Sequence, residues 1–292
     1  MYTADSFGNN WAISYFSLMK YLTPFIILLL ASLPAVHAAQ SMSAEDASYL
    51  KYDETLACYH AGKCAKAYRL FEEVMPLLID KKEIISATFY QACSSFYRRS
   101  LVKLKKSYKS SAHQFQSFYQ TYPKAPQAEE ALYMQDYALY LASPDIEVDQ
   151  ATTHEALQTL QTYLDQYPAG LYRDQALQYQ EKLNDQLAHK AFNKAKRYHE
   201  LSKYQAAVTA LTNFQQDFPN HSLGEEAAYL KADAQCKLAQ KGPKEAQQER
   251  LRTTLTYCHD FIGRYPESHY VQAIEKIYEQ TLGQLNKPDT SP

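Results

Sequence analysis

Histidine, cysteine and acidic residues are the side chains of this 292-residue chain that would hold a metal or carry out catalysis. A helical zinc site requires histidines at positions i and i+4, with a glutamate beside the first. His154-Glu155 begins this pattern, but the second ligand is absent because the residue at the required position is Gln158. His189 and His199 are ten positions apart and do not share ligand spacing on one helix face. The sequence therefore predicts no metal site.

The short motifs of common enzymes are also missing. The sequence contains no Gly-x-Ser-x-Gly, no Cys-x-x-Cys and no glycine-rich phosphate loop. Only 7 residues are glycine, whereas average usage of about 7% predicts roughly 20. A net charge of −2 shows no sign preference that would indicate a nucleic-acid partner. We therefore expect a protein that is not an enzyme and binds neither a cofactor nor nucleic acid.

The five cysteines allow two interpretations. Cys58 and Cys64 flank a predicted turn at Gly62, where a disulfide would staple the first hairpin of an exported protein. Alternatively, both are small buried hydrophobic residues. Cys236 and Cys258 form a weaker candidate pair. The remaining cysteine, Cys93, is then most simply interpreted as part of the core.

The N-terminal segment has the features of a secretory signal peptide. Lys20 precedes a short apolar run at residues 25–33, and Val36 and Ala38 give the small residues of a cleavage site. The run is shorter than the roughly 20 residues that span a bilayer. We expect residues 1–38 to be removed, with Met19 as an alternative start, and export to the periplasm.

A repeated string of residues organises the rest of the chain. An aromatic residue is followed by three residues, a second aromatic residue and a proline, with successive prolines 45, 51 and 47 residues apart. Because proline cannot continue a helix, each string predicts a helix end. The four strings are Phe118–Pro123, Tyr163–Pro168, Phe214–Pro219 and Phe261–Pro266.

The fourth unit fits the 34-residue tetratricopeptide template without gaps. Tyr198, Ala207, Phe214 and Pro219 occupy its small, aromatic and terminal positions. The other units match the same template at some of its positions. The sequence thus predicts an all-α fold, a right-handed α-α superhelix of about five tetratricopeptide repeats.

The predicted organisation follows from the phase of the repeats. We expect repeats one to three over residues 39–167, and repeats four and five with a terminal helix over residues 168–284. Residues 171–201 are predicted to form one long helix or two collinear ones, because no helix breaker interrupts them. Residues 285–292 are predicted to be a disordered tail.

Aromatic residues exceed what the repeat template requires, with 26 tyrosines and 12 phenylalanines. First helices of such hairpins line the inner, peptide-binding face of a solenoid. Large aromatic rings with few rotamers suit a surface that binds varied peptides. Interior packing is the alternative for each ring. The candidate substrate-binding residues are Tyr49, Tyr52, Phe89, Tyr90, Phe96 and Tyr97.

Four further strings are Ala131-Leu132-Tyr133, Ser143-Pro144 followed by Asp149-Gln150, Leu230-Lys231-Ala232 and residues 265–270. These strings give the chain a resemblance to the BamD family, in its Bacteroidota-type branch, over most of its length. It implies a five-repeat periplasmic scaffold of the outer-membrane β-barrel assembly machinery. Such a scaffold would bind the barrel subunit BamA, other subunits of the machinery and unfolded outer-membrane proteins.

The same resemblance suggests how the C-terminal repeats meet BamA. Arg250, Arg252 and Arg264 are the candidate docking residues, chosen by charge and repeat position. One departure from the family is that no cysteine follows the signal peptide, since the first is Cys58. We therefore expect indirect association with the inner face of the outer membrane. The alternative function is a free periplasmic adaptor that binds peptides or coordinates envelope or peptidoglycan machinery.

Overall fold

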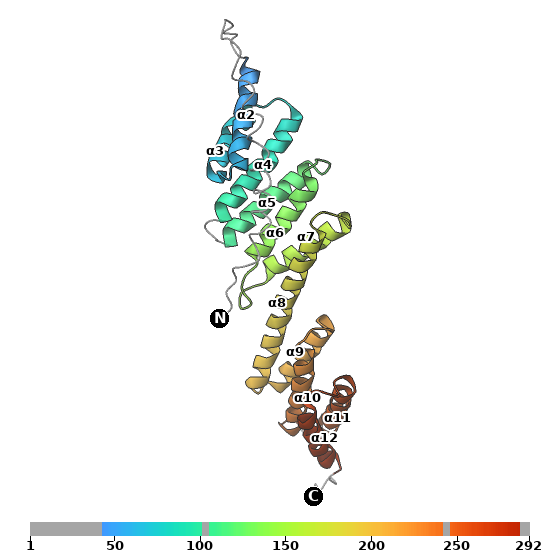
Figure 1. The fold of residues 1–292 in the computed structure, drawn as a ribbon. Helices are drawn as coiled ribbons and strands as arrows, with labels where there is room; N and C mark the ends of the chain where they lie inside the picture. The colour runs from blue at the N-terminus through green and yellow to red at the C-terminus, as the bar shows by residue number, and fades with distance from the viewer. Residues whose placement is uncertain (1–42, 101–104, 242–245, 287–292) are drawn as a thin grey trace. The chain divides into compact units, whose positions relative to one another are not determined.

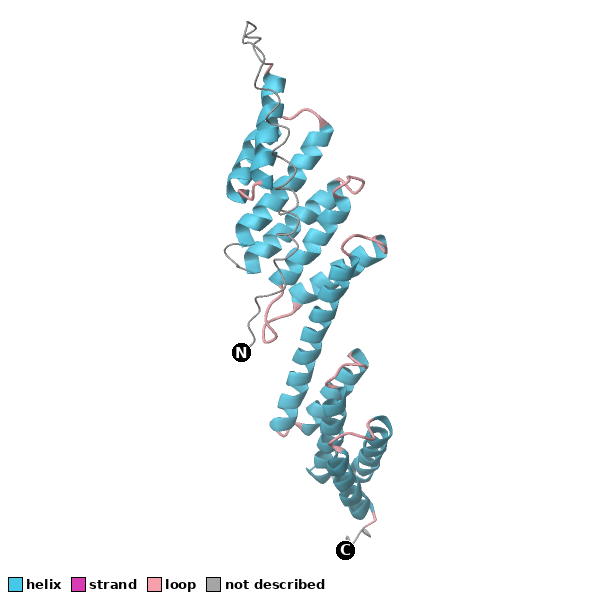
Figure 2. Cartoon of the chain, viewed as in Figure 1, coloured by secondary structure: helices cyan, strands magenta, loops and turns pink. Residues whose placement is uncertain are grey.

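The computed structural model describes residues 43–100, 105–241 and 246–286. The predicted signal peptide and residues 287–292 lie outside these ranges. Within them every regular element is helical (Figure 2). The eleven α-helices, labelled in Figure 1, are α2 (Ala44–His60), α3 (Cys64–Val74), α4 (Lys81–Ser100), α5 (Lys105–Thr121), α6 (Ala128–Ala142), α7 (Ala151–Gln166), α8 (Arg173–Glu200), α9 (Tyr204–Asp217), α10 (Gly224–Lys241), α11 (Gln247–Arg264) and α12 (Val271–Leu285), and a short 3-10 helix, η2 (Met75–Leu77), follows α3.

Within each part of the chain, most helices pack against the next one in sequence. In the N-terminal part α2 packs on α3 and α3 on α4, and in the C-terminal part α8, α9, α10, α11 and α12 each pack on the next. Helices two apart also touch, as α2–α4, α8–α10 and α10–α12 do. This pattern of neighbours is that of stacked helical hairpins, so the predicted all-α repeat fold is confirmed.

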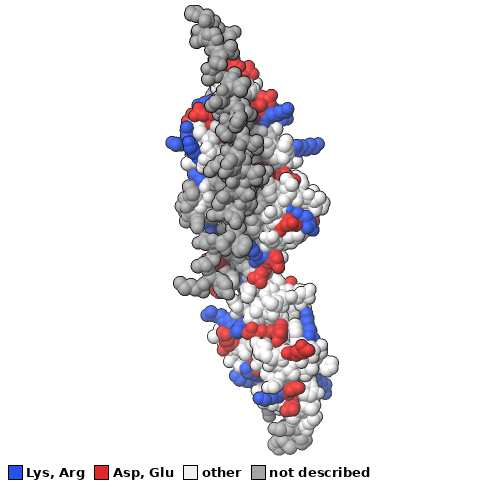
Figure 3. Space-filling model, viewed as in Figure 1, with Lys and Arg blue, Asp and Glu red and all other residues white. Residues whose placement is uncertain are grey.

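The chain divides into two compact units whose boundary lies within α6, between Ala131 and Leu132. The sequence instead placed its division between residues 167 and 168, from the phase of the repeats. The helix α12 ends at Leu285, the first residue assigned to the predicted tail. On the face seen in Figure 3, basic and acidic side chains are interspersed.

The aromatic–proline strings end their helices by a shared set of contacts. The second aromatic residue caps the helix, and its backbone N–H donates to the carbonyl of the first, as Tyr167 does to Tyr163 at 2.8 Å. The two rings also touch, with centroids 5.5 Å apart in this pair. The same cap occurs at the ends of α5, α9 and α11. The first ring of each pair is buried, so one string both stops a helix and fills the core.

Small residues let the helices approach closely. Ala207 of α9 is 0% exposed and packs with Val208 and with Ala234 of α10. Ala188 and Ala195 of α8 are equally buried and pack with Leu211 and Phe214 of α9. The helix α8 runs unbroken over 28 residues, which confirms the prediction of one long helix.

The turn between α6 and α7 is held by a network of amides. The side-chain nitrogen of Gln150 donates to the carbonyls of Asp145 and Val148, both at 2.9 Å. Its side-chain oxygen accepts from Thr153 at 2.7 Å and from Gln186 of α8 at 2.9 Å. The Ser-Pro…Asp-Gln part of the family resemblance therefore has a structural purpose, which is to fix this turn against α8.

The cysteines correct one prediction. All five are free thiols in the structure, so Cys58 and Cys64 are not joined. Cys58 points into the interior among Ala67 and Phe71, whereas Cys64 begins α3 and is half-buried. Cys236 and Cys258 are buried and unjoined as well. The interpretation as small packed hydrophobic residues accounts for them.

Thiol titration tests this assignment. Unfolded without reductant, the protein should release five reactive thiols, because none is oxidised. In the native state Cys64 should react first, although burial raises the pKa of its thiol and slows it. The variant Cys64→Ser should lose this first phase. A count of three thiols after unfolding would show that a disulfide exists.

Candidate functional site

Five tyrosines from two helices and a helix cap gather into one group, the tyrosine cluster: Tyr133, Tyr137 and Tyr140 of α6, and Tyr172 and Tyr179 at the start of α8. The rings of Tyr133 and Tyr172 stack with centroids 4.1 Å apart and planes 8° apart. Those of Tyr140 and Tyr179 stack at 4.5 Å and 17°. The hydroxyls of Tyr133 and Tyr179 are 3.5 Å apart.

The helical period places these rings together. Positions 133, 137 and 140 follow the i, i+4, i+7 spacing of one helix face, and positions 172 and 179 repeat the i, i+7 step. Tyr133 is 1% exposed and forms the base, while the other four rings are half-buried and reach solvent. This cluster was not predicted from the sequence, although the spacing of the three tyrosines on α6 indicates a shared helix face.

Hydrogen bonds and burial fix the chemical state of the cluster. The hydroxyl of Tyr163 on α7 accepts from the backbone N–H of Tyr172 at 3.0 Å and so positions that residue. Burial raises the pKa of Tyr133, Tyr140 and Tyr179. Their phenols are therefore neutral. The cluster presents flat apolar rings with polar edges, which suits binding of apolar and aromatic side chains rather than acid–base chemistry.

One acid lies buried on the same helix. Asp136 of α6 is 0% exposed, and neither carboxyl oxygen has a hydrogen-bond partner among the described residues. The hydroxyl of Thr159 on α7 lies nearby but donates to the carbonyl of Ala156 at 3.1 Å. Burial raises the pKa of Asp136 to about 8, more than Thr159 lowers it. The group is thus a neutral acid at pH 7.

The structure corrects three of the predicted substrate-binding residues. Tyr52, Phe89 and Phe96 are 7%, 2% and 2% exposed and belong to the interior of the N-terminal unit. The ring of Phe89 packs 5.4 Å from that of Phe118, and the ring of Phe96 packs 6.2 Å from that of Phe115. The two phenylalanines fill the space between α4 and α5, and Tyr52 of α2 packs in the cluster that contains Ala67 and Phe71. None of the three is available to a ligand.

The other three rings remain accessible in part. Tyr49, Tyr90 and Tyr97 are half-buried on α2 and α4. Tyr90 packs against Tyr59, with centroids 5.0 Å apart. A role for Tyr49, Tyr90 and Tyr97 in binding substrate stays a prediction.

The predicted docking arginines do not form one patch. Arg250 is half-buried at the start of α11, and its Nη1 atom is enclosed without a hydrogen-bond partner among the described residues. Arg252 is exposed. Arg264 lies about 18 Å further along the helix, where its Nη2 donates to the carbonyl of Pro219 at 2.6 Å. Arg264 therefore ties the end of α11 to the loop after α9.

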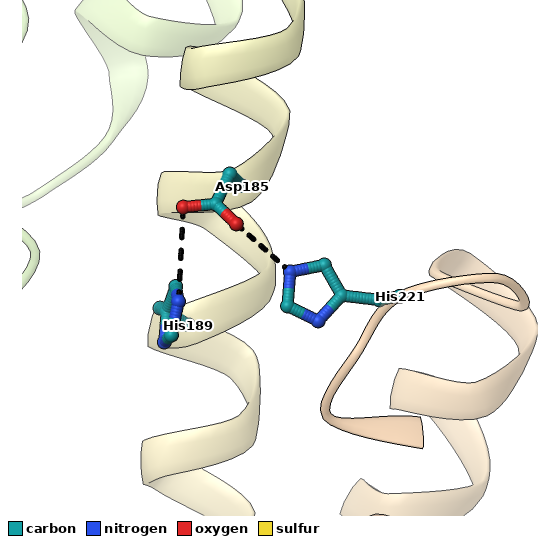
Figure 4. Close-up of side chains that lie close together, drawn as sticks. All are labelled: Asp185, His189 and His221. Carbon is teal, nitrogen blue, oxygen red and sulfur yellow. Dashed lines mark hydrogen bonds and ion pairs between the residues drawn. The ribbon is translucent and has the colours of Figure 1, made fainter. Parts of the chain in front are cut away.

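Asp185, His189 and His221 come together where α8 meets the turn before α10 (Figure 4). The Nε2 atom of His221 lies 3.1 Å from Asp185, and that of His189 lies 3.7 Å from the same carboxylate. The Nδ1 atom of His221 accepts from the backbone N–H of Leu223 at 3.1 Å. That bond places the ring proton on Nε2, so Nε2 donates to Asp185 and has no lone pair for a metal. We interpret the cluster as a contact that holds the turn before α10 against α8.

Antiparallel helical hairpins with alanines at their crossings define a helical-repeat protein of the tetratricopeptide type. The family model YfiO, described as outer membrane lipoprotein, matches residues 45–222 and 202–285. The chain therefore belongs to the YfiO family, the BamD-type family to which the sequence analysis pointed, and this family is not enzymatic. No curated protein matches the chain. Across the described ranges, no helix combines the length and apolar character needed to cross a bilayer.

The buried acid predicts a pH dependence of stability. Its folded-state pKa of about 8 is raised above the ordinary 3.8, so the folded state keeps a proton that the unfolded state releases. This contribution to stability is complete below pH 4 and is lost as the pH rises toward 8. The free energy of unfolding of Asp136→Asn should therefore rise relative to that of wild type by about 1.4 kcal/mol per pH unit in that window.

Urea unfolding at pH 5, 6, 7 and 8 measures this difference. Asp174→Asn, on the exposed first turn of α8, is the matched control. Its free energy of unfolding should depend on pH in the same way as that of wild type. Parallel curves for Asp136→Asn as well would show that Asp136 is already ionised in the folded protein.

Proposed function

We propose that the chain is a non-enzymatic scaffold of outer-membrane protein assembly that binds unfolded outer-membrane proteins on the periplasmic side. The observation that carries this proposal is the YfiO family match, which extends over residues 45–285 with two overlapping segments. Membership in this family links the chain to outer-membrane assembly.

The tyrosine cluster supports the binding of substrate segments. Tyr137, Tyr140, Tyr172 and Tyr179 offer ring surface to solvent above the buried Tyr133. Stacked rings lose little rotamer freedom when a ligand binds, so their contact area converts well into affinity. An extended segment with aromatic or branched apolar side chains would bind here. Such segments are what an unfolded β-barrel strand presents on its lipid-facing side.

Docking on a BamA-like barrel subunit is proposed for α11. Arg252 is exposed, and Arg264 is exposed at the other end of the helix. An acidic surface on the partner would pair with them, mainly to set orientation and association rate. Arg250 would contribute its exposed atoms only, since its Nη1 is enclosed.

Association with the outer membrane is proposed to be indirect. All five cysteines lie within helices of the structure. Acylation would need a cysteine at the mature N-terminus, and cleavage before Cys58 would remove most of α2. A partner subunit would then hold the scaffold at the inner face of the outer membrane.

A crosslinked pull-down from cell envelopes tests the assignment to assembly. We expect recovery of the barrel subunit together with nascent outer-membrane proteins. Recovery of other envelope proteins in place of both would exclude the assembly function and favour a free periplasmic adaptor.

Binding on the tyrosine cluster is tested by Tyr137→Ala/Tyr140→Ala. Loss of two partly exposed rings should weaken binding of a peptide with a C-terminal aromatic residue about tenfold or more, at roughly 1 kcal/mol per ring. Fluorescence anisotropy of a labelled peptide gives the Kd. Tyr278→Ala on α12, where the ring is 38% exposed, is the control and should bind like wild type. An equal loss of peptide affinity in both variants would show that the tyrosine cluster is not the binding site.

A further inference from the structure

A recess of about 700 Å³ opens where α8 ends and α9 begins. Its apolar floor is formed by Ala206 and Ala210 of α9, with Leu238 from the end of α10 beside them. Tyr198 of α8 and Tyr204 of α9 also line it. An apolar lining that includes two aromatic rings suits an apolar side chain of a ligand.

The polar lining of this recess carries one sign of charge. Lys194, Lys203 and Lys241 contribute ammonium groups, and none of the lining residues is acidic. Within the described ranges, Lys194 and Lys203 have no carboxylate within ion-pair distance. The ammonium of Lys241 lies 5.0 Å from the centroid of the Tyr204 ring. The recess therefore has positive groups that a ligand can neutralise.

One acidic residue of α10 is already paired within the protein. Asp233 accepts from Lys237 at 2.7 Å and is hydrogen-bonded to His199 of α8. Burial raises the pKa of its carboxyl, but these contacts together bring it below the usual range. Because Asp233 is neutralised by its own partners, it does not cancel the charge of the recess.

A second recess along α8 differs in this respect. It shares Lys194 and adds Lys190, Lys196 and Arg197, but it is also lined by Glu147 and Glu200. The ammonium of Lys190 donates to the carbonyl of Val148, and that of Lys196 pairs with Glu226, so both are used within the protein. Lys194 and Arg197 are then balanced by the two glutamates of the lining, and this recess has no preference for an anionic ligand.

We propose that the recess between α8 and α9 binds an acidic peptide segment of a partner protein, with an apolar side chain seated on the alanine floor. The carboxylates beside that side chain would pair with Lys194 and Lys203, which line the same recess. A lipid surface fits less well, because a membrane-binding face presents apolar groups outward. Here the aliphatic part of the lining is limited to Ala206, Ala210 and Leu238, within a recess.

This site is distinct from the tyrosine cluster and uses none of its residues. It would give the protein a second class of partner, selected by negative charge rather than by aromatic content. Each surface ion pair contributes about 0.2–1 kcal/mol, and both partners keep considerable freedom, so the affinity should be micromolar and sensitive to salt.

The test uses the mature full-length chain and a dye-labelled peptide, Asp-Glu-Phe-Asp-Glu, capped at both ends. Anisotropy at low salt should show saturable binding. Lys194→Glu/Lys203→Glu should raise the Kd about tenfold or more, because two attractions become repulsions. Lys124→Glu/Lys182→Glu reverses two exposed charges outside the recess and is the matched control. It should change the Kd less than threefold.

Two further measurements separate the recess from general electrostatics. Ala206→Trp fills the floor without a change of charge and should weaken binding about as much as the double reversal. A peptide with glycine in place of phenylalanine should also bind about tenfold more weakly. Equal losses in the control and recess variants would overturn the proposal. The proposal would also be overturned if phosphatidylglycerol vesicles and the glycine peptide displaced the labelled peptide equally well.

The outcome is independent of the proposed assembly function. Tyr137→Ala/Tyr140→Ala should leave binding of the acidic peptide unchanged, while Lys194→Glu/Lys203→Glu should leave binding of the aromatic peptide unchanged. If only the recess results fail, the tyrosine cluster and the pull-down still stand. If only those fail, the recess remains a site for acidic segments.

Discussion

Close approach of helices at alanine residues is the constraint on which the structure depends. Ala67, Ala87, Ala188, Ala195 and Ala207 have no exposed surface, and each lies where two helices meet. A larger side chain would separate the helix axes and leave gaps around the aromatic rings beside it. The buried phenylalanines and tyrosines therefore pack well only because the alanines set the distance between helices.

Local chemistry explains which predictions from sequence succeed. A helix end with an aromatic cap and a following proline is encoded within six residues, so the ends of α5, α7, α9 and α11 and the burial of Phe118, Tyr163, Phe214 and Phe261 were predictable. The long helix α8 was predictable because nothing within it breaks a helix. Gln150 was recognisable as part of a motif, although its hydrogen bonds to the turn and to Gln186 were not.

Environment beyond the local sequence explains the failures. Helices in a repeat array bury more than one face, so an aromatic residue on a first helix faces either a neighbouring helix or solvent. Phe89 and Phe96 face α5, and the sequence gives no sign of it. The tyrosine cluster combines α6 with the start of α8, and Tyr172 lies far from Tyr133 in sequence while its ring is 4.1 Å away. Such a group is defined only once the helices are packed.

The unbroken course of α8 has a consequence for valency. Tyr179 and Lys194 are carried on one rigid helix, about 22 Å apart along its axis and within about 60° around it. An extended chain of roughly seven residues covers that distance. A partner with an aromatic residue and an acidic group at that separation would engage both at once, with the second contact made at high effective concentration. With both proposed sites in use, α8 would select ligands by the distance between an aromatic residue and an acidic group, two contacts that are each weak.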